Sequence, residues 1–263
     1  RRETDLMAIH PQAIIESGAK LAPDVDIGPW TLIGPNVEIG RGTVVRSHVV
    51  INAHTKIREY NQIYQFASVG EANQDKKYHG EATRLEIGDH NVIRESCTIH
   101  RGTVQDQGVT RIGSHNLLMA YAHVAHDCTL GDHTIMANMA ALAGHVQVDD
   151  FAILGGGTMV HQFCIVGQHS MCAGGSIVLK DIPAYLMAGG QPATAHGLNF
   201  EGLKRRGFSK EAQHALRRAY KTVYRKNLML NEAVEMLQEE AVKFPEIKNF
   251  ITSIENSTRG IVR

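Results

Sequence analysis

An apolar residue recurs at every sixth position over most of this chain. The series runs without a gap from Ile9 to Val69, returns from Ile87 to Ile99, and continues one residue out of step from Ile112 to Val178. Four residues after most of these positions the chain carries a small or β-branched residue. An α-helix repeats about every 3.6 residues and a strand about every two, so neither produces this period. Hexapeptide solenoids do, because each hexad supplies one short strand and one corner.

The period also predicts which residues lie above one another. Six residues span about 15–20 Å at roughly 3.3 Å per residue, and three such edges close a triangular coil of about eighteen residues. Each residue then stacks beneath the one eighteen positions later, and the two repeated positions of every hexad point into the core. The spacing predicts a mainly β fold, a solenoid of parallel strands, and leaves its handedness open.

Two polar segments interrupt the period. They lie at 71–85 and 103–110, and the second shifts the register by one residue. Segments that leave a regular solenoid are either surface insertions or lids over a site, and both interpretations stay open at this point.

The pattern changes beyond Val178. A linker rich in Pro and Gly is followed by helical spacing. Ser209 and Asn231 are candidate N-caps, and Pro245 can begin a last helix. We therefore predict a β-helix over 7–190 and a C-terminal helical domain over 191–263.

Composition narrows the class of protein. The formal net charge is zero, which does not indicate nucleic-acid binding. No run of about 18 apolar residues is present, so we expect no transmembrane segment. Cys128 and Cys164 fall in one column two coils apart, about 9–10 Å, beyond the roughly 7 Å limit for a disulfide. Reduced cysteines in a cytoplasmic protein are the simpler interpretation.

The N-terminal segment gives no targeting signal. It is basic but has no apolar core long enough for a signal peptide. Because it lacks an initiator Met, we interpret residues 1–6 as a processed or added end.

One column of the coil carries a candidate active site. Gly144 lies eighteen residues beyond His126, and Gln162 lies eighteen beyond Gly144. His145 and His161 flank the column. This spacing places an imidazole about 4.8 Å from a glycine backbone. Histidine is the natural general base near neutral pH.

The neighbours of this pair favour a chemical role. Asp127 can fix the tautomer of His126, and the Gly144 amide, which no side chain obstructs, can receive a developing oxyanion. The chain has 15 histidines, so a cluster without function is the alternative. The polar segment that contains Asp75 borders the same face, which favours a site.

Six segments of the chain closely resemble the UDP-N-acetylglucosamine 3-O-acyltransferase family. In order they are NQDKKYHGE, SCTIHRGTVQD, AYAHVAHDCTLGD, LAGHVQVDD, VHQFCIVG and NFEGLKRRGFS. The likeness extends from Ile9 to Arg263. It implies a left-handed parallel β-helix with a helical tail, assembled as a cytoplasmic homotrimer with active sites between neighbouring subunits.

The resemblance also implies a reaction. An (R)-3-hydroxyacyl group moves from the phosphopantetheine of acyl carrier protein to the 3-hydroxyl of UDP-N-acetylglucosamine, the first step of lipid A biosynthesis. By resemblance, His126 is the general base, Asp127 its orienting partner and Gly144 the amide that stabilises the oxyanion. The family uses no metal and no bound cofactor. The residues that match substrate contacts are Asp75, Lys77, His100, His123, His145, His161, Gln162, Asn199, Glu201, Arg205 and Arg206.

Three further expectations concern the acyl donor. By the same resemblance, Gly174 aligns with a position where members of the family carry either glycine or a bulky residue, and a bulky side chain shortens the acyl pocket. Glycine therefore implies room for an acyl chain of about fourteen carbons. The basic tail around Lys204 is either a solvated helix face or a dock for the acidic carrier protein. Direct transfer needs no covalent intermediate, and Cys128 and Cys164 face the core and should be inert.

Three other readings remain. The sister N-acyltransferase of the same pathway usually carries a nucleotide-binding domain ahead of the solenoid, whereas the period here starts at Ile9. A trimeric γ-type carbonic anhydrase would use histidines to bind zinc. A purely structural solenoid is disfavoured because no threonine ladder repeats on one flat face. The sequence leaves open the exact acyl length and whether the acceptor is the ordinary sugar or its 3-amino analogue.

Overall fold

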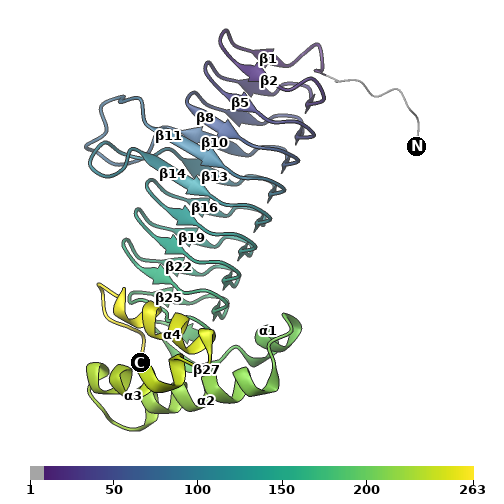
Figure 1. Cartoon of the computed structure of the whole chain (residues 1–263). Coiled ribbons are helices and arrows are strands. Elements are labelled where there is room, and N and C mark those ends of the chain that lie inside the picture. The colour runs from purple at the N-terminus through teal and green to yellow at the C-terminus, as the bar shows by residue number, and fades with distance from the viewer. Residues whose placement is uncertain (1–8) are drawn as a thin grey trace.

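A column of parallel coils, capped at one end by helices, forms the molecule (Figure 1). The computed structural model describes residues 9–263. The coils form a left-handed parallel β-helix with a C-terminal helical domain, which confirms the predicted fold class. The predicted start of the β-helix at residue 7 and the segment 1–6 lie outside the described residues.

Three sheets form the three walls of the column. Sheet 1 contains β1 (Ile14–Ile15), β4 (Leu32–Ile33), β7 (Val50–Ile51), β10 (Ser68–Glu71), β13 (Thr98–His100), β16 (His123–Val124), β19 (Ala141–Leu142), β22 (Met159–Val160) and β25 (Ile177–Val178). Sheet 2 contains β2 (Lys20–Leu21), β5 (Glu38–Ile39), β8 (Thr55–Ile57), β11 (Arg84–Ile87), β14 (Val109–Ile112), β17 (Thr129–Leu130), β20 (Gln147–Val148) and β23 (Ile165–Val166). Sheet 3 contains β3 (Asp26–Ile27), β6 (Val44–Val45), β9 (Gln62–Ile63), β12 (Val92–Ile93), β15 (Leu117–Leu118), β18 (Ile135–Met136), β21 (Ile153–Leu154), β24 (Met171–Cys172), β26 (Leu186–Gly190) and β27 (Ala193–Leu198).

The strand register confirms the eighteen-residue coil. His123 pairs with Ala141, and Met159 pairs with Ile177. The spacing grows where the polar segments intervene: Ser68 pairs with Thr98, and Thr98 pairs with His123. The extra residues leave the column as two neighbouring loops, which Figure 1 shows projecting on one side between β10 and β14. We call 72–83 the first loop and 101–108 the second loop.

The core is the stack of repeated apolar residues. Side chains such as Ile33, Ile63 and Leu142 are fully buried. Residues at the corners adopt positive φ, among them Asp127 at 58° and His145 at 62°. Aspartate, asparagine and histidine tolerate this left-handed conformation better than most residues. The corners therefore accept the polar residues that the site needs.

The predicted domain boundary at 190/191 and the predicted linker differ from the structure. β26 continues sheet 3 beside β24 and turns back antiparallel as β27, so the β-structure extends to Leu198. The strand escaped the sequence pattern because Met187 pairs with Met171, sixteen residues away, which breaks the six-residue period. The hairpin covers an otherwise open sheet edge.

Four helices complete the chain: α1 (Phe200–Arg205), α2 (Lys210–Arg225), α3 (Leu230–Ala241) and α4 (Pro245–Glu255). Ser209 caps α2 through its side chain, as predicted. The predicted cap Asn231 is wrong, because α3 begins two residues earlier than that cap implies: Met229 occupies the N-cap position, and Glu232 accepts its backbone N–H. None of the helices formed by residues 9–263 has the length and apolar character to cross a membrane.

Candidate active site

A cavity of about 670 Å³ lies against sheet 1. Strands β13, β16, β19 and β22 supply its floor, and residues 74–76 of the first loop supply one side. His126, at the corner that follows β16, lines it together with His100 and His123. The cavity therefore brings together side chains far apart in the sequence.

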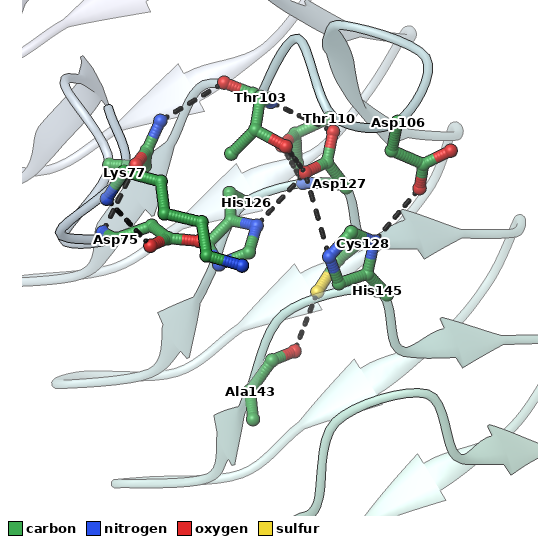
Figure 2. A network of polar contacts seen from close by, with 12 residues as sticks. Asp75, Lys77, Thr103, Asp106, Thr110, His126, Asp127, Cys128, Ala143 and His145 are labelled. Carbon is green, nitrogen blue, oxygen red and sulfur yellow. Dashed lines mark hydrogen bonds and ion pairs between the residues drawn. The ribbon is translucent and has the colours of Figure 1, made fainter. Parts of the chain in front are cut away.

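His126 lies between a carboxylate and a glycine. Its Nδ1 is 2.9 Å from Asp127 Oδ2, and its side chain is 16% exposed (Figure 2). A Cβ atom at position 144 would stand 2.5 Å from His126 Cε1 and 2.7 Å from Nε2. Only glycine leaves room for the imidazole there, and this confirms the predicted stacking of His126 beneath Gly144. Within residues 9–263 the Gly144 N–H donates to no backbone or side-chain acceptor, so it is available to a ligand.

Asp127 is held from several sides. Its side chain is only 1% exposed. Thr103 donates its backbone N–H to Oδ1 at 2.9 Å and its hydroxyl to Oδ2 at 2.6 Å. The Asp127 N–H donates to Thr110 Oγ1 at 2.8 Å. Burial alone would raise the pKa of Asp127, but the hydrogen bonds from His126 and Thr103 outweigh it and lower that pKa. The carboxylate is therefore ionised at neutral pH.

His145 stands edge-on to His126. The ring centroids are 5.0 Å apart at 87°. His145 Nδ1 lies 2.8 Å from Asp106 Oδ2 of the second loop, and Nε2 lies 4.0 Å from Asp127 Oδ2. His126, Asp127 and His145 are the one group in residues 9–263 whose ligand atoms lie close enough together to hold a metal ion. The Asp127 carboxylate oxygens are already occupied by hydrogen bonds, which favours a proton-transfer network over a metal site.

Two more histidines give the cavity a polar but uncharged wall. Burial lowers the pKa of His100 to about 4. Burial, and then the proximity of His126, lowers the pKa of His123. His123 Nδ1 is 2.7 Å from Thr98 Oγ1. Both imidazoles are neutral at pH 7 and can hydrogen-bond a sugar or nucleotide without adding charge.

The first loop supplies charged groups. Asp75 lines the cavity, and its Oδ1 accepts the Lys77 N–H at 3.0 Å (Figure 2). Lys77 lies beside Asp75 but does not itself line the cavity, whereas its neighbours Gln74 and Lys76 do. Sequence reasoning missed these two lining residues, because the loop has no six-residue period from which to predict which side chains point into the cavity.

The segment that follows β13 anchors the first loop. The Gly102 carbonyl accepts from Asn73 Nδ2 at 3.1 Å. The Arg101 guanidinium donates to the Tyr78 hydroxyl at 2.8 Å and to the carbonyls of Gly70 and Ala53 at 3.0 and 3.3 Å. Arg101, though charged, is only 9% exposed. The loop that carries Asp75 is therefore tied to the body of the column.

The remaining predicted residues are divided between the cavity and other surfaces. Gln162 lines the cavity, and exposed His161 stands at its edge with Nδ1 3.2 Å from the Gln162 carbonyl oxygen. Gly174 lies outside it, at the corner that precedes β25.

The tail residues lie at a different corner. Asn199 caps α1 and donates to the His169 carbonyl at 3.0 Å, and the Arg206 guanidinium stands 4.1 Å from the centre of the Phe151 ring. Phe151 and His169 form the corner between sheets 2 and 3, whereas His126 stands between sheets 1 and 2. Within one chain the structure does not bring Asn199, Glu201, Arg205 and Arg206 to the cavity.

The cysteines offer no nucleophile. All four are free and buried. Burial raises the pKa of Cys128 to about 12 and that of Cys164 to about 11, so neither is a thiolate at neutral pH. This agrees with the expectation that both are inert.

Sequence reasoning also missed Thr103, Thr110 and Asp106. All three lie in the predicted polar segment 103–110, but eighteen-residue spacing does not apply across an insertion. The sequence showed only that two threonines and an aspartate lie in a polar segment that interrupts the six-residue period.

Comparisons with known proteins fit this geometry. The family described as Udp N-acetylglucosamine O-acyltransferase, Domain 2, matches residues 181–262, and Bacterial transferase hexapeptide (six repeats) matches residues 110–144. A Thiobacillus denitrificans protein named acyl-(acyl-carrier-protein)–UDP-N-acetylglucosamine O-acyltransferase is 59% identical over 258 residues, 98% of this chain and 100% of that protein. A protein of the same name from Pseudomonas aeruginosa is 58% identical over 255 residues, 97% of this chain and 99% of its own. The solved structure of LpxA from Acinetobacter baumannii has a TM-score of 0.95 at 52% identity, covering 98% of this chain and 100% of that chain.

Proposed function

This chain belongs to the UDP-N-acetylglucosamine O-acyltransferase family, and on that premise we propose how its residues carry out the reaction. The enzyme transfers an acyl group from acyl carrier protein to UDP-N-acetylglucosamine, the first step of lipid A biosynthesis. The sister N-acyltransferase and carbonic anhydrase readings lose their support, because the relatives are named O-acyltransferases over the full length.

The arrangement of His126 supports a general-base mechanism. The Asp127 carboxylate accepts a hydrogen bond from Nδ1–H, which leaves Nε2 unprotonated to take the proton of the sugar 3-hydroxyl as that oxygen attacks the thioester carbonyl. The Gly144 N–H donates to the oxyanion of the tetrahedral intermediate. Collapse breaks the carbon–sulfur bond, and His126 returns the proton to the departing thiol. General-base help of this kind supplies roughly 10²–10⁴-fold, and one oxyanion donor about 10²–10³-fold.

One observation carries this proposal. A single imidazole lies against an ionised, fully buried carboxylate on one side and against a glycine on the other, at the wall of a cavity. The reaction so written needs no metal and no cofactor beyond the phosphopantetheine of the carrier protein. Four free, buried cysteines fit the reducing cytoplasm, where we place the enzyme.

We assign the remaining predicted residues in and beside the cavity to the acceptor. Asp75 and Lys77 lie on the loop at the cavity's side, where they can contact the sugar nucleotide. The neutral imidazoles of His100 and His123 suit hydroxyl and amide groups. The other members of this set are His145, His161 and Gln162.

The tail residues support a homotrimer. The cavity is open along sheet 1, while Asn199, Glu201, Arg205 and Arg206 lie at another corner of the same chain. Parallel packing of three columns about a threefold axis gives each cavity the tail of a neighbour. In that arrangement the basic groups of the tail meet the acidic carrier protein and its donor.

The corner between sheets 3 and 1 suits a long acyl chain. Gly156 and Gly174 stack there, one coil apart, and both are exposed. A Cβ atom at either position would have only backbone atoms within 4 Å, so neither glycine is covered by a side chain. We propose an (R)-3-hydroxyacyl donor of about fourteen carbons, because a glycine wall admits the longest chains.

His126→Ala tests the assignment of the base. We expect the variant to fold and assemble yet lose roughly 10²–10⁴-fold in kcat, the usual contribution of a general base. Turnover is measured with carrier-linked donor and UDP-N-acetylglucosamine. His115→Ala is the matched control, since His115 is an exposed corner histidine between sheets 2 and 3. Activity of His126→Ala near that of this control would refute the mechanism.

A further inference from the structure

Within the described residues, Thr103 is the residue of the second loop that hydrogen-bonds to the pair His126 and Asp127. We propose that Thr103 is a positioning residue, which fixes the Asp127 carboxylate and through it the orientation of His126. This inference rests on the proposed role of His126 as the base. Figure 2 shows Thr103 above Asp127, on the side of the carboxylate away from Ala143.

Thr103 holds the carboxylate at two points. The backbone N–H reaches Oδ1 at 2.9 Å, and the hydroxyl reaches Oδ2 at 2.6 Å. A single donor would leave the carboxylate free to rotate about its Cβ–Cγ bond, whereas two donors from one rigid residue define its plane. Oδ2 is also the oxygen that lies 2.9 Å from His126 Nδ1. Thr103 therefore fixes the orientation of the same carboxylate oxygen that hydrogen-bonds to the imidazole of His126.

No solvent molecule can easily replace the hydroxyl. Thr103 is 1% exposed, and so is the side chain of Asp127. A buried carboxylate oxygen that loses a donor keeps the cost of its desolvation without the compensating bond. The geometry of Asp127 and His126 therefore depends on the hydrogen bond from the Thr103 hydroxyl.

Thr103 is itself held rigidly. Its carbonyl accepts the Gly108 N–H at 2.9 Å and the Asp106 N–H at 3.3 Å, which closes the second loop on it. On its other side, Gly102 packs so tightly that a Cβ atom would stand 2.2 Å from Val109 N. These contacts preorganise both donors before substrate binds.

A purely structural role for Thr103 makes different predictions. Loss of loop packing would lower stability and raise KM, and it would leave the pH dependence unchanged. Loss of positioning lowers kcat. It also moves the acid limb of the rate profile, because the Thr103 hydrogen bonds help to keep the pKa of Asp127 low. Without the hydroxyl the pKa of Asp127 rises, so its carboxylate is protonated at higher pH and activity is lost at a higher pH on acidification.

Thr103→Val removes the hydroxyl at nearly constant volume and keeps the backbone N–H. We expect kcat to fall about ten- to a hundredfold, the range for a hydrogen bond to a charged group. KM for UDP-N-acetylglucosamine should stay within about twofold. The acid limb of kcat should shift to higher pH. Thr103→Ser keeps the hydroxyl and should restore most of the activity and the original pH profile.

Two controls make the outcomes distinct. Thr55→Val is matched in chemistry, because Thr55 is equally buried but its hydroxyl has no partner among the described residues. It should leave kcat and the pH profile unchanged. Thermal melting checks that each variant is folded, and Thr103→Ala serves as a second deletion of the hydroxyl.

The overturning results are clear-cut. A Thr103→Val enzyme with wild-type kcat and pH profile refutes the inference, and so does a Thr103→Ser enzyme as slow as Thr103→Val. His126→Ala is assayed in the same series. If it stays active, the proposed mechanism itself fails, whereas an inactive His126→Ala beside an unaffected Thr103→Val overturns only the role of Thr103.

Discussion

At the residue scale, glycines define where substrate atoms can go. Gly144 makes room for an imidazole, and Gly174 lies exposed at the corner that precedes β25. The two differ in what a replacement meets. A Cβ at Gly174 would lie 3.2 Å from the Gly156 carbonyl oxygen, a tight contact that a small shift relieves. Position 174 can therefore carry a side chain without loss of the fold.

Gly174→Met tests the proposed acyl route. A methionine there projects over the corner, so it should obstruct long chains and spare short ones. We expect kcat/KM for a donor of about fourteen carbons to drop roughly tenfold or more, since each excluded methylene forfeits about 0.8 kcal/mol. A donor of about ten carbons is the internal control and should be used as before. Equal effects on both donors would remove Gly174 from the acyl route.

Contacts on the regular coil could be predicted from the spacing, whereas contacts made by the loops could not, although Asp75 of the first loop was named by resemblance and lines the cavity. His126 and Gly144 are eighteen residues apart, so their contact follows from the period alone. Thr103 and Asp127 are joined across an insertion, where the spacing carries no information. Lys77 illustrates the same limit, since its neighbours line the cavity and it does not.

At the element scale, the first loop depends on one buried arginine. Arg101 donates to two backbone carbonyls and to the Tyr78 hydroxyl, and its Nε has no partner among the described residues. A buried guanidinium that loses another acceptor costs about 1–3 kcal/mol. The loop's position over the cavity therefore depends on the Tyr78 hydroxyl.

Tyr78→Phe should loosen the first loop without touching the base. We expect KM for UDP-N-acetylglucosamine to rise about three- to tenfold, with kcat within about twofold of wild type. Tyr224→Phe is the matched control, because Tyr224 is a half-buried tyrosine of α2 whose hydroxyl has no partner in residues 9–263. An unchanged KM in Tyr78→Phe would show that this contact does not hold the loop in place.

The hairpin β26–β27 shows where element prediction from sequence fails. Its residues are rich in Gly and Pro, which usually indicate a linker. Strand β24 nevertheless offers a free edge, and pairing satisfies backbone groups that would otherwise be exposed. Tertiary context decided this element, whereas the start of α3 follows from a local contact, the Met229 N–H that donates to Glu232.

At the scale of the whole molecule, the cavity beside His126 and the basic tail lie on different corners of the column. An active site that contains both the cavity and the basic tail must be formed by residues of two chains. The homotrimer proposed above satisfies this geometry, and a monomer does not.

Mixed oligomers test whether His126 and Arg206 of one active site come from different chains. His126→Ala and Arg206→Ala should each be nearly inactive alone. When the two are coexpressed in equal amounts, a site that pairs His126 of one chain with Arg206 of another is intact in about a quarter of cases, so about a quarter of wild-type activity should return. Wild-type enzyme mixed with an equal amount of His126→Ala measures the efficiency of mixing. Mixtures no more active than the separate variants would place both residues in one chain's site.

The stacked coil also restricts how such an enzyme can change over time. Adding or deleting one residue within a strand would turn every later side chain inside out, because the faces alternate. Length can vary harmlessly only where the backbone departs from the column, as it does at 72–83 and 101–108. Those two departures supply Asp75, Thr103 and Asp106 to the site. New chemistry on this scaffold is therefore expected to arise by insertion at the corners, while the rungs themselves stay constant in length.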